Sequence, residues 1–193
     1  MSSLPDYVVI NKSAKAQSDL LKKTSRQIEF PLSTTDKEML DLLVAKYEAE
    51  ENIAGLAAVQ IGFPIQAIVF AVPAADETKL QAPRNDIIDT MEKTLWLNAT
   101  YEAVGTAKTI DYEACFSVNN LTGPVPRYDT IQYEAYDLAG TKITGVAHGF
   151  LARVIQHEID HTQGILFTDL IENKAELISH DKYREILQDK QSQ

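Results

Sequence analysis

The feature that most constrains how this chain can fold is the segment HEIDH, at residues 157–161. Two histidines four residues apart on a helix lie on one face, one turn apart, where both rings can reach a single metal ion. Glu158 follows His157 by about 100° around the helix, so it can reach a water molecule on that ion without being a ligand. The pattern therefore predicts a helix over 149–162 that carries part of a metal site, with Gly164 as its stop.

The same helix is predicted to be buried. Its apolar residues cover most of its circumference, and they are Phe150, Leu151, Val154, Ile155 and Ile159. Unpaired imidazoles in such surroundings cost free energy unless a metal ion or a hydrogen-bond partner satisfies them. A solvated helix with two surface histidines is the alternative, and these apolar neighbours argue against it.

The two histidines need a third ligand. A catalytic zinc-like site uses three protein ligands and leaves one position open for water. Cys115, the single cysteine of the chain, is one candidate, and a downstream carboxylate is the other: Glu172, Glu176 or Glu185. A downstream carboxylate would indicate a metalloprotease of the zincin kind. Spacing favours Cys115 only weakly, because a strand and a helix can meet at any separation in sequence.

The hydrophobic pattern predicts several further elements. A capping box at residues 35–38 opens an amphipathic helix over 36–50. Strands are predicted at 66–72, 93–103, 107–116, 129–137 and 141–147, with a loop over 119–126, an exposed excursion over 74–89 and a polar helix over 173–189. The pattern indicates an α+β fold, in which antiparallel β-sheets pack around a central buried helix carrying the HExxH motif and a C-terminal helix follows.

Composition narrows the class of protein further. The 193 residues fit one domain, 1–193, and a hydrophobic content of 45% is ordinary for a globular protein. A net charge of −10 repels phosphate backbones and anionic lipid headgroups, so neither DNA nor a membrane is an expected partner. The N-terminus has no signal-peptide pattern, and a single cysteine cannot form an intrachain disulfide. We therefore expect a cytoplasmic protein.

Three stretches resemble the motifs of the peptide deformylase family and follow the same order. They are IAGLAAVQ at 53–60, EACFS at 113–117 and QHEIDH at 156–161. Their flanks are also similar, at 125–127, 149–153 and 164–167. The resemblance spans about residues 30–171 and implies that Cys115 is the third metal ligand, beside His157 and His161.

This resemblance also implies an activity, the hydrolysis of the N-formyl group from formylmethionine at the start of nascent polypeptides, with release of formate. Glu158 would take the proton of a metal-activated water, while the Gln60 side chain and the backbone N–H of Phe116 would stabilise the oxyanion. The residues expected to contact the peptide are Ala54, Gly55, Leu56, Glu113 and Ala114. Asp160 or a neighbour is expected to orient the ligands.

One divalent metal ion is the implied cofactor. Two imidazoles and one thiolate suit Zn(II), whereas the resemblance points to Fe(II) in the cell, with Zn(II) or Ni(II) as alternatives in purified protein. The implied partners are N-formylated nascent peptides in a bacterial cytoplasm. Association with the ribosome is an option that this role leaves open.

The chain departs from the family pattern at several positions. Ile53 and Ala54 stand where the family has a Gly-led pair, Ala114 replaces a glycine and Phe116 replaces a leucine. Ala99 also stands where a proline is usual. The ligands, the base and the oxyanion glutamine are all kept, so the departures bear on substrate range more than on reaction type. Three alternatives therefore stay open: a relative that acts on another acyl group, a metal-binding paralogue without activity, and the zincin-type protease.

Overall fold

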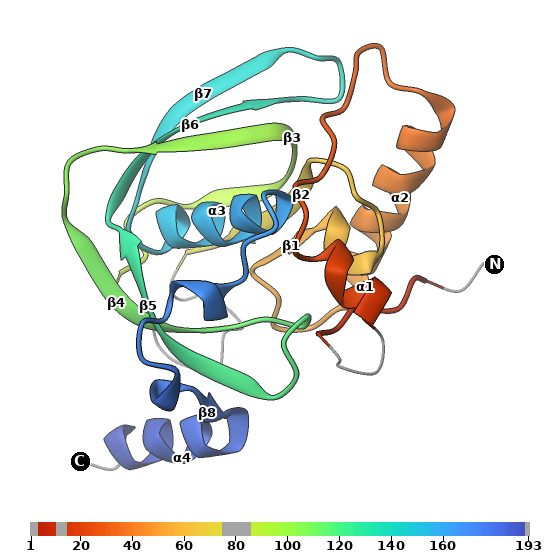
Figure 1. Cartoon of the computed structure of the whole chain (residues 1–193). Coiled ribbons are helices and arrows are strands. Elements are labelled where there is room, and N and C mark those ends of the chain that lie inside the picture. Colours follow the sequence, from red (N-terminus) through yellow and green to blue (C-terminus); the bar gives the residue numbers. More distant parts are fainter. Residues whose placement is uncertain (1–3, 11–14, 75–85, 192–193) are drawn as a thin grey trace.

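The computed structural model describes residues 4–10, 15–74 and 86–191, and it contains two antiparallel sheets around one long helix (Figure 1). The five-stranded sheet has the order β1 (Gly55–Ala57), β2 (Ala67–Val72), β3 (Met91–Ala103), β6 (Thr130–Tyr136) and β7 (Lys142–His148). The three-stranded sheet has the order β4 (Lys108–Ala114), β5 (Leu121–Tyr128) and β8 (Ile178–Ser179). The predicted α+β class with antiparallel sheets is thus confirmed.

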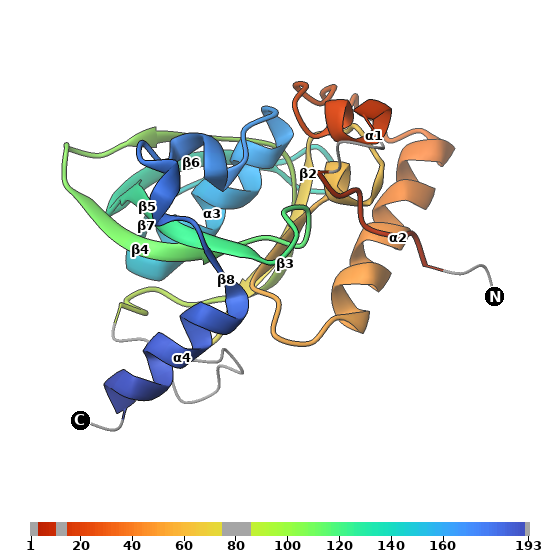
Figure 2. The same cartoon turned by 60° about the horizontal axis from the view of Figure 1, so that its bottom comes forward.

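The helix between the sheets is α3 (Gly149–Thr162), which contacts strands of both sheets and is buried along most of its length (Figures 1 and 2). Its bounds agree with the prediction, because its apolar residues give it a packed surface on nearly every side. The predicted stop at Gly164 is also confirmed. Gly164 has a φ of +76°, and a Cβ there would lie 2.7 Å from the backbone of Lys22, so both conformation and space require glycine.

Helix α2 (Thr34–Ala49) packs on β1 and β2 through Leu40, Leu43 and Tyr47. Its amphipathic character was predicted correctly, but the predicted capping box at 35–38 is wrong by two residues. Ser33 is the N-cap, and its hydroxyl oxygen accepts a hydrogen bond of 3.0 Å from the backbone N–H of Asp36. Three hydroxyl residues stand at this helix start, at positions 33–35, and the first of them reaches the free N–H groups.

The segment predicted as a loop over 119–126 is largely strand β5 (Leu121–Tyr128), which pairs with β4 from Thr122 to Tyr128. Its Asn, Gly and Pro residues suggested a loop, and Pro124 and Pro126 cannot donate to a ladder. They are two residues apart, however, so their nitrogens face the same edge of the strand. The neighbouring β8 pairs only with Leu121 and Thr122, and the prolines therefore lie beyond it.

The C-terminal helix α4 (His180–Gln191) starts seven residues later than the predicted 173. The residues before it form a 3₁₀ turn, η3 (Lys174–Glu176), and strand β8, because pairing with β5 overrides their helical pattern. The remaining helical elements are α1 (Lys15–Leu20), η1 (Ala58–Ile61) and η2 (Phe167–Leu170). The predicted excursion over 74–89 lies mostly outside the described residues. No helix in the described part of the chain is long and apolar enough to span a bilayer.

Candidate metal centre

Three potential ligands converge where the end of β4 meets α3. Cys115 directly follows β4, while His157 and His161 lie one turn apart on α3. The Cys115 Sγ and the His157 Nε2 each lie 3.2 Å from the His161 Nε2. The three ligand atoms all lie within 4.8 Å of one another. The structure therefore brings together the three residues that the sequence singled out.

The chemistry of this donor set fits a divalent metal ion. Ligands bound tetrahedrally at about 2.0–2.3 Å from one ion are about 3.3–3.7 Å apart, close to the observed contacts. The His157 Nδ1 lies 2.8 Å from a Glu113 carboxylate oxygen, which makes Nδ1 the donor and turns Nε2 towards the cluster. Two facing nitrogens and a thiol need a cation or shared protons between them. A metal ion with thiolate and imidazole ligands satisfies all three at once.

The competing ligand set, with a downstream carboxylate, finds no support in the structure. Glu172, Glu176 and Glu185 are exposed, and among the described residues the metal-capable group contains none of them. The reason is the late start of α4, since η3 and β8 lead the chain along β5 and away from α3. The cysteine, which spacing favoured only weakly, is the residue beside the two imidazoles.

A buried ionic network lies behind His157. The carboxylate of Glu113 contacts the His157 ring, receives two hydrogen bonds of 2.9 Å from Arg127, and receives a third of 2.7 Å from Arg153. Arg127 also pairs with Asp160. Glu113 was expected to contact the peptide, and Asp160 or a neighbour to orient a ligand. Both Glu113 oxygens are engaged by side chains, and one of these side chains is the His157 ring, so Glu113 contacts a candidate ligand directly, whereas Asp160 pairs with Arg127.

Sequence reasoning did not assign Arg127 or Arg153 any role, although both stand in the similar flanking stretches. Two further hydrogen bonds hold Asp160 and Arg153 in this network. The Tyr101 hydroxyl donates a hydrogen bond of 3.1 Å to Asp160, and Arg153 donates to the Thr109 backbone carbonyl at 2.7 Å. A buried arginine in an otherwise apolar stretch was the one signal of this network, since such a charge needs a partner.

Burial and this network shift the titration of the site. Burial raises the pKa of Glu158 to about 7; His157 opposes that shift and Glu113 adds to it. For Glu113, burial alone would raise the pKa, but the hydrogen bond from His157 and the charge of Arg127 bring it below its usual range. Burial and the neighbouring His157 lower the pKa of His161. Glu113 is therefore an anion at neutral pH, and His161 is a neutral ring with a lone pair to offer.

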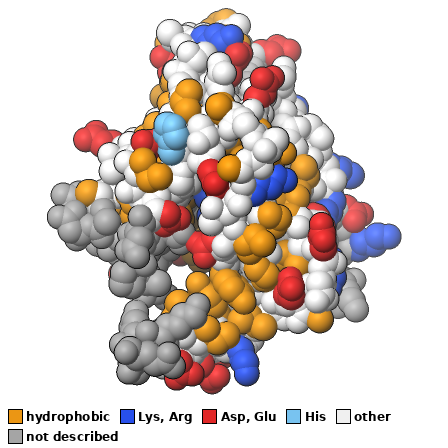
Figure 3. Space-filling model, turned by 90° about the vertical axis from the view of Figure 1, so that its left-hand side faces the viewer, with side chains coloured by type: hydrophobic (Ala, Val, Ile, Leu, Met, Phe, Trp, Pro, Cys, Tyr) orange, Lys and Arg blue, Asp and Glu red, His pale blue; other side chains and the backbone are white. Residues whose placement is uncertain are grey.

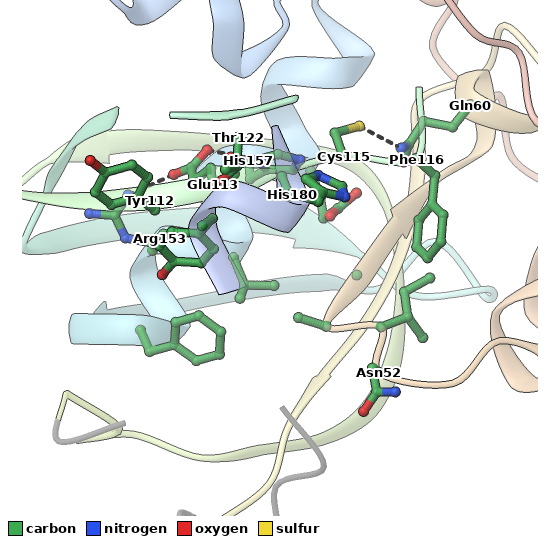
Figure 4. Close-up of a pocket in the computed structure, with 18 of the residues that line it drawn as sticks. Asn52, Gln60, Tyr112, Glu113, Cys115, Phe116, Thr122, Arg153, His157 and His180 are labelled. Atoms are coloured by element: carbon green, nitrogen blue, oxygen red, sulfur yellow. Dashed lines mark hydrogen bonds and ion pairs between the residues drawn. The ribbon is translucent and has the colours of Figure 1, made fainter. Parts of the chain in front are cut away.

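Gln60 reaches the candidate centre from the opposite side, from the 3₁₀ turn η1 (Figure 4). Its side-chain oxygen accepts a hydrogen bond of 2.8 Å from the backbone N–H of Ala57, which fixes the orientation of the amide. Its side-chain nitrogen is thereby directed at the Cys115 Sγ, 3.2 Å away. The amide therefore presents its donor, rather than its acceptor, to the ligand cluster.

Phe116 stands next to Cys115 in the turn that follows β4. Its ring is 42% exposed and stacks on the ring of Tyr7, with centroids 4.7 Å apart. The turn is held by a hydrogen bond of 3.0 Å from the Val118 N–H to the Cys115 carbonyl. The bulk that Phe116 adds in place of leucine is thus accommodated by the N-terminal segment.

A cavity of about 460 Å³ opens beside Cys115 and His157 (Figure 4). The segment 51–55 forms one wall, the end of β4 forms another, and α3 contributes Phe150 and Val154. Helix α4 contributes a face of residues spaced as one helical stripe: His180, Tyr183, Arg184 and Leu187. Figure 3 shows hydrophobic side chains gathered on the side of the molecule that carries β4 and α4, where Ile110 and Tyr112 are exposed.

The residues expected to contact the peptide divide into two groups. Ala54, Gly55, Glu113 and Ala114 line the cavity. Leu56 does not, because its side chain is fully buried in the cluster beneath α2. Strand β1 is at the edge of its sheet, so one side of its backbone has no partner among the strands of the described residues.

The comparisons with known proteins agree with one another. The model of the family described as polypeptide deformylase matches residues 10–176. The chain is 46% identical over 186 residues to peptide deformylase 2 of Rickettsia conorii, covering 95% of this chain and 91% of that protein. It is 43% identical over 114 residues to peptide deformylase 2 of Ralstonia nicotianae, covering 59% and 60%.

Solved structures show the same fold. The crystal structure of peptide deformylase from Ehrlichia chaffeensis has a TM-score of 0.73 and 23% identity, covering 98% of both chains. The Met-Ala-Ser-bound class I type b enzyme from Acinetobacter baumannii has a TM-score of 0.72 and 24% identity, covering 89% of this chain and all of that one. At these identities the likeness concerns the fold alone.

Proposed function

Because the chain belongs to the polypeptide deformylase family, we propose that it removes the N-formyl group from formylmethionyl peptides and releases formate. The observation that carries this proposal is the convergence of Cys115, His157 and His161, with a buried glutamate next to them in sequence. We further propose that residues 1–193 act as one catalytic domain in a bacterial cytoplasm, on nascent peptides, with the ribosome nearby as an option.

Cys115, His157 and His161 would hold the divalent ion. When bound there, the ion supplies a Lewis acid that makes hydroxide available near neutral pH and polarises the formyl carbonyl. Glu113 keeps the His157 ring in place, because its carboxylate accepts the Nδ1 proton at 2.8 Å. Fe(II) in the cell, and Zn(II) or Ni(II) in purified protein, all suit these ligands.

Glu158 is the proposed proton carrier. It precedes Ile159 on the buried side of α3, and one of its carboxylate oxygens has no hydrogen-bond partner within the described part of the chain. The oxygen of water adds to the formyl carbon while Glu158 accepts the proton. The carbon–nitrogen bond then breaks, Glu158 returns the proton to the departing amine, and formate leaves.

The developing oxyanion needs fixed donors. We assign this role to the Gln60 side-chain nitrogen and the backbone N–H of Phe116, which flank Cys115 on two sides. Gln60 is held by the Ala57 N–H and so does not have to reorient when the negative charge forms. Donors fixed before the reaction stabilise a transition state more than mobile ones do.

The peptide is proposed to lie in the cavity as an added strand along the free edge of β1. The methionine side chain would face Phe150 and Val154 of α3, which line the same cavity. Tyr183 and Leu187 of α4 would close that side. A bound Met-Ala-Ser in the Acinetobacter baumannii enzyme supports a peptide of this kind as the ligand.

Formate release provides the test. Protein purified without oxygen and loaded with iron or nickel should release formate from formyl-Met-Ala-Ser, whereas Glu158→Gln should be slower by at least 100-fold. Elemental analysis of both proteins is the control, since the variant should retain its metal. Equal rates for the two proteins would end the proposal.

A different acyl group is the second candidate substrate. The observation that favours it is the pair of departures at the cavity, Ala114 and Phe116, which both line it. A panel of methionyl peptides carrying formyl, acetyl and longer acyl groups separates the two, because a redirected enzyme should prefer a group other than formyl. Metal binding without turnover on any of them would indicate a paralogue that has lost activity.

A further inference from the structure

The N-terminal segment 7–10 bridges two parts of the proposed site. The Val8 N–H donates a hydrogen bond of 2.7 Å to the backbone carbonyl of Gln60. Two residues on, the Ile10 N–H donates one of 2.9 Å to the carbonyl of Ser117, just past Phe116. Val8 is also buried in the core beside α3. The segment is therefore joined to both turns that carry the proposed oxyanion donors.

Tyr7 makes the third contact of this segment. Its ring lies parallel to the ring of Phe116, with 5° between the planes and 4.7 Å between the centroids. The ammonium group of Lys46, on α2, lies 4.3 Å from the centre of the same tyrosine ring and is paired with Glu50 at 2.9 Å. Phe116 is thus connected through Tyr7 to α2, which runs beside the N-terminal segment (Figure 2).

We propose that residues 7–10 form a strap that sets the distance between Gln60 and the Phe116 N–H, and that Tyr7 is a positioning residue for both. This proposal rests on the oxyanion roles given above. Gln60 belongs to the turn after β1, whereas Phe116 follows β4 in the other sheet, so the described strands share no ladder that fixes their separation, and the Gln60 side chain contacts the Phe116 turn at Cys115. The strap adds a backbone link through two hydrogen bonds and one ring stack.

The stack also gives a physical reason for the departure at position 116. A planar ring can stack on Tyr7 over its whole face, which a leucine cannot do. Stabilisation of an oxyanion depends steeply on donor position, and a displacement of a fraction of an ångström lowers the rate. We therefore expect Tyr7 to set the position of Phe116, and not only to stabilise the fold.

The ring contact is tested with Tyr7→Ala and its conservative partner Tyr7→Phe. Tyr7→Ala should lower kcat for formyl-Met-Ala-Ser about tenfold with KM changed less than twofold, because donors to the oxyanion act in the transition state. Tyr7→Phe keeps the ring and should restore kcat to within about twofold of the parent. Equal impairment of both variants would overturn the role of the ring.

The backbone contact is tested at Ile10, whose side chain is 38% exposed. Ile10→Pro removes the N–H that binds the Ser117 carbonyl, while the matched Ile10→Ala keeps it. Ile10→Pro should lower kcat severalfold at unchanged metal content, and Ile10→Ala should behave as the parent protein does. If the two variants have the same kcat, the strap does not act through this hydrogen bond.

An independent readout separates this proposal from the function itself. In two-dimensional NMR spectra of the zinc-loaded protein, Tyr7→Ala should shift the backbone amide of Phe116 and the side-chain amide of Gln60, and Tyr7→Phe should leave both in place. If the parent protein releases no formate, the proposed function fails while the NMR comparison still tests the strap. Unshifted amides in Tyr7→Ala, or an unchanged kcat, would overturn the strap.

Discussion

Gly55 lies against the carboxylate of Glu158 so closely that a Cβ at residue 55 would stand 2.6 Å from both the Glu158 Cγ and Oε1. The first residue of β1 therefore shapes the space in which the proposed proton carrier sits. Glycine is needed here because of close approach to a side chain, and not because of an unusual φ. Strand β1 and helix α3 therefore approach each other closely at Gly55 and Glu158.

Gly55→Ala should abolish most of the activity. The added methyl group has to displace Glu158, because distances under 3.0 Å are not tolerated between such atoms. We expect formate release to fall at least 100-fold while zinc or nickel content stays at that of the parent. The control is Gly105→Ala, whose added Cβ has nothing within 4 Å but whose φ of +81° strains an alanine, so it should lower stability and leave formate release unchanged. Activity of Gly55→Ala within twofold of the parent would contradict the assigned position of Glu158.

Glu113→Gln should weaken metal binding and the fold together. The variant removes the charge of Glu113, one of the two carboxylates that pair with Arg127. Breaking a buried ion pair costs about 3–5 kcal/mol. Loss of the His157 contact should raise the metal dissociation constant about 10–100-fold. Urea unfolding and competition with a chelator measure the two effects. Glu134→Gln is the control, since its pair with Lys142 is exposed to solvent and should contribute little to either measurement.

Cys115→Ala should lose the metal at concentrations where the parent holds it. Two imidazoles alone form an incomplete set, so zinc affinity should fall by at least about 100-fold. Glu172→Gln, by contrast, should keep full stoichiometry, because Glu172 lies outside the ligand group. Elemental analysis after gel filtration distinguishes the two variants. Full zinc in Cys115→Ala together with loss in Glu172→Gln would restore the zincin-type site.

Asp36→Asn should change how the stability of the protein depends on pH. Burial acts to raise the pKa of Asp36, but the hydrogen bonds from Arg26 and Ser33 outweigh it and lower the pKa below 3.8. A lowered carboxyl pKa stabilises the fold above the ordinary value, and that stabilisation is lost as pH falls through the lowered one. The difference in unfolding free energy between the parent and Asp36→Asn should therefore be largest near neutral pH and shrink below about pH 4.

Ser33→Ala provides a companion measurement at the same helix end. It removes the hydroxyl that accepts the Asp36 N–H and should cost about 1 kcal/mol at neutral pH. Thr35→Ala is the matched control and should cost less, because Ser33 is the residue that caps α2. Unfolding in urea measures both. A larger loss in Thr35→Ala would favour the capping box originally predicted at 35–38.

Helix α3 and the class of chemistry were predictable from the sequence alone. Two histidines four residues apart share a helix face whatever surrounds them, and the apolar neighbours of His157 required burial, so the bounds of α3 were predictable. The local sequence pattern predicted secondary structure less reliably where pairing with another strand decides it. The Asn, Gly and Pro residues of 119–126 suggested a loop in place of β5, and the predicted start of α4 was too early. Both predictions are wrong because a partner strand lies far away in sequence.

Tertiary structure alone decided which groups meet. Nothing in the spacing of residues 55 and 158 indicates that one would touch the other, and the same is true of Glu113 behind His157 and of Tyr7 against Phe116. Hydrophobic periodicity shows which residues of one helix or strand share a face. It carries no information on which residues of another element pack against that face. The contacts that orient the candidate site join different elements, and they exist only once the two sheets have closed around α3.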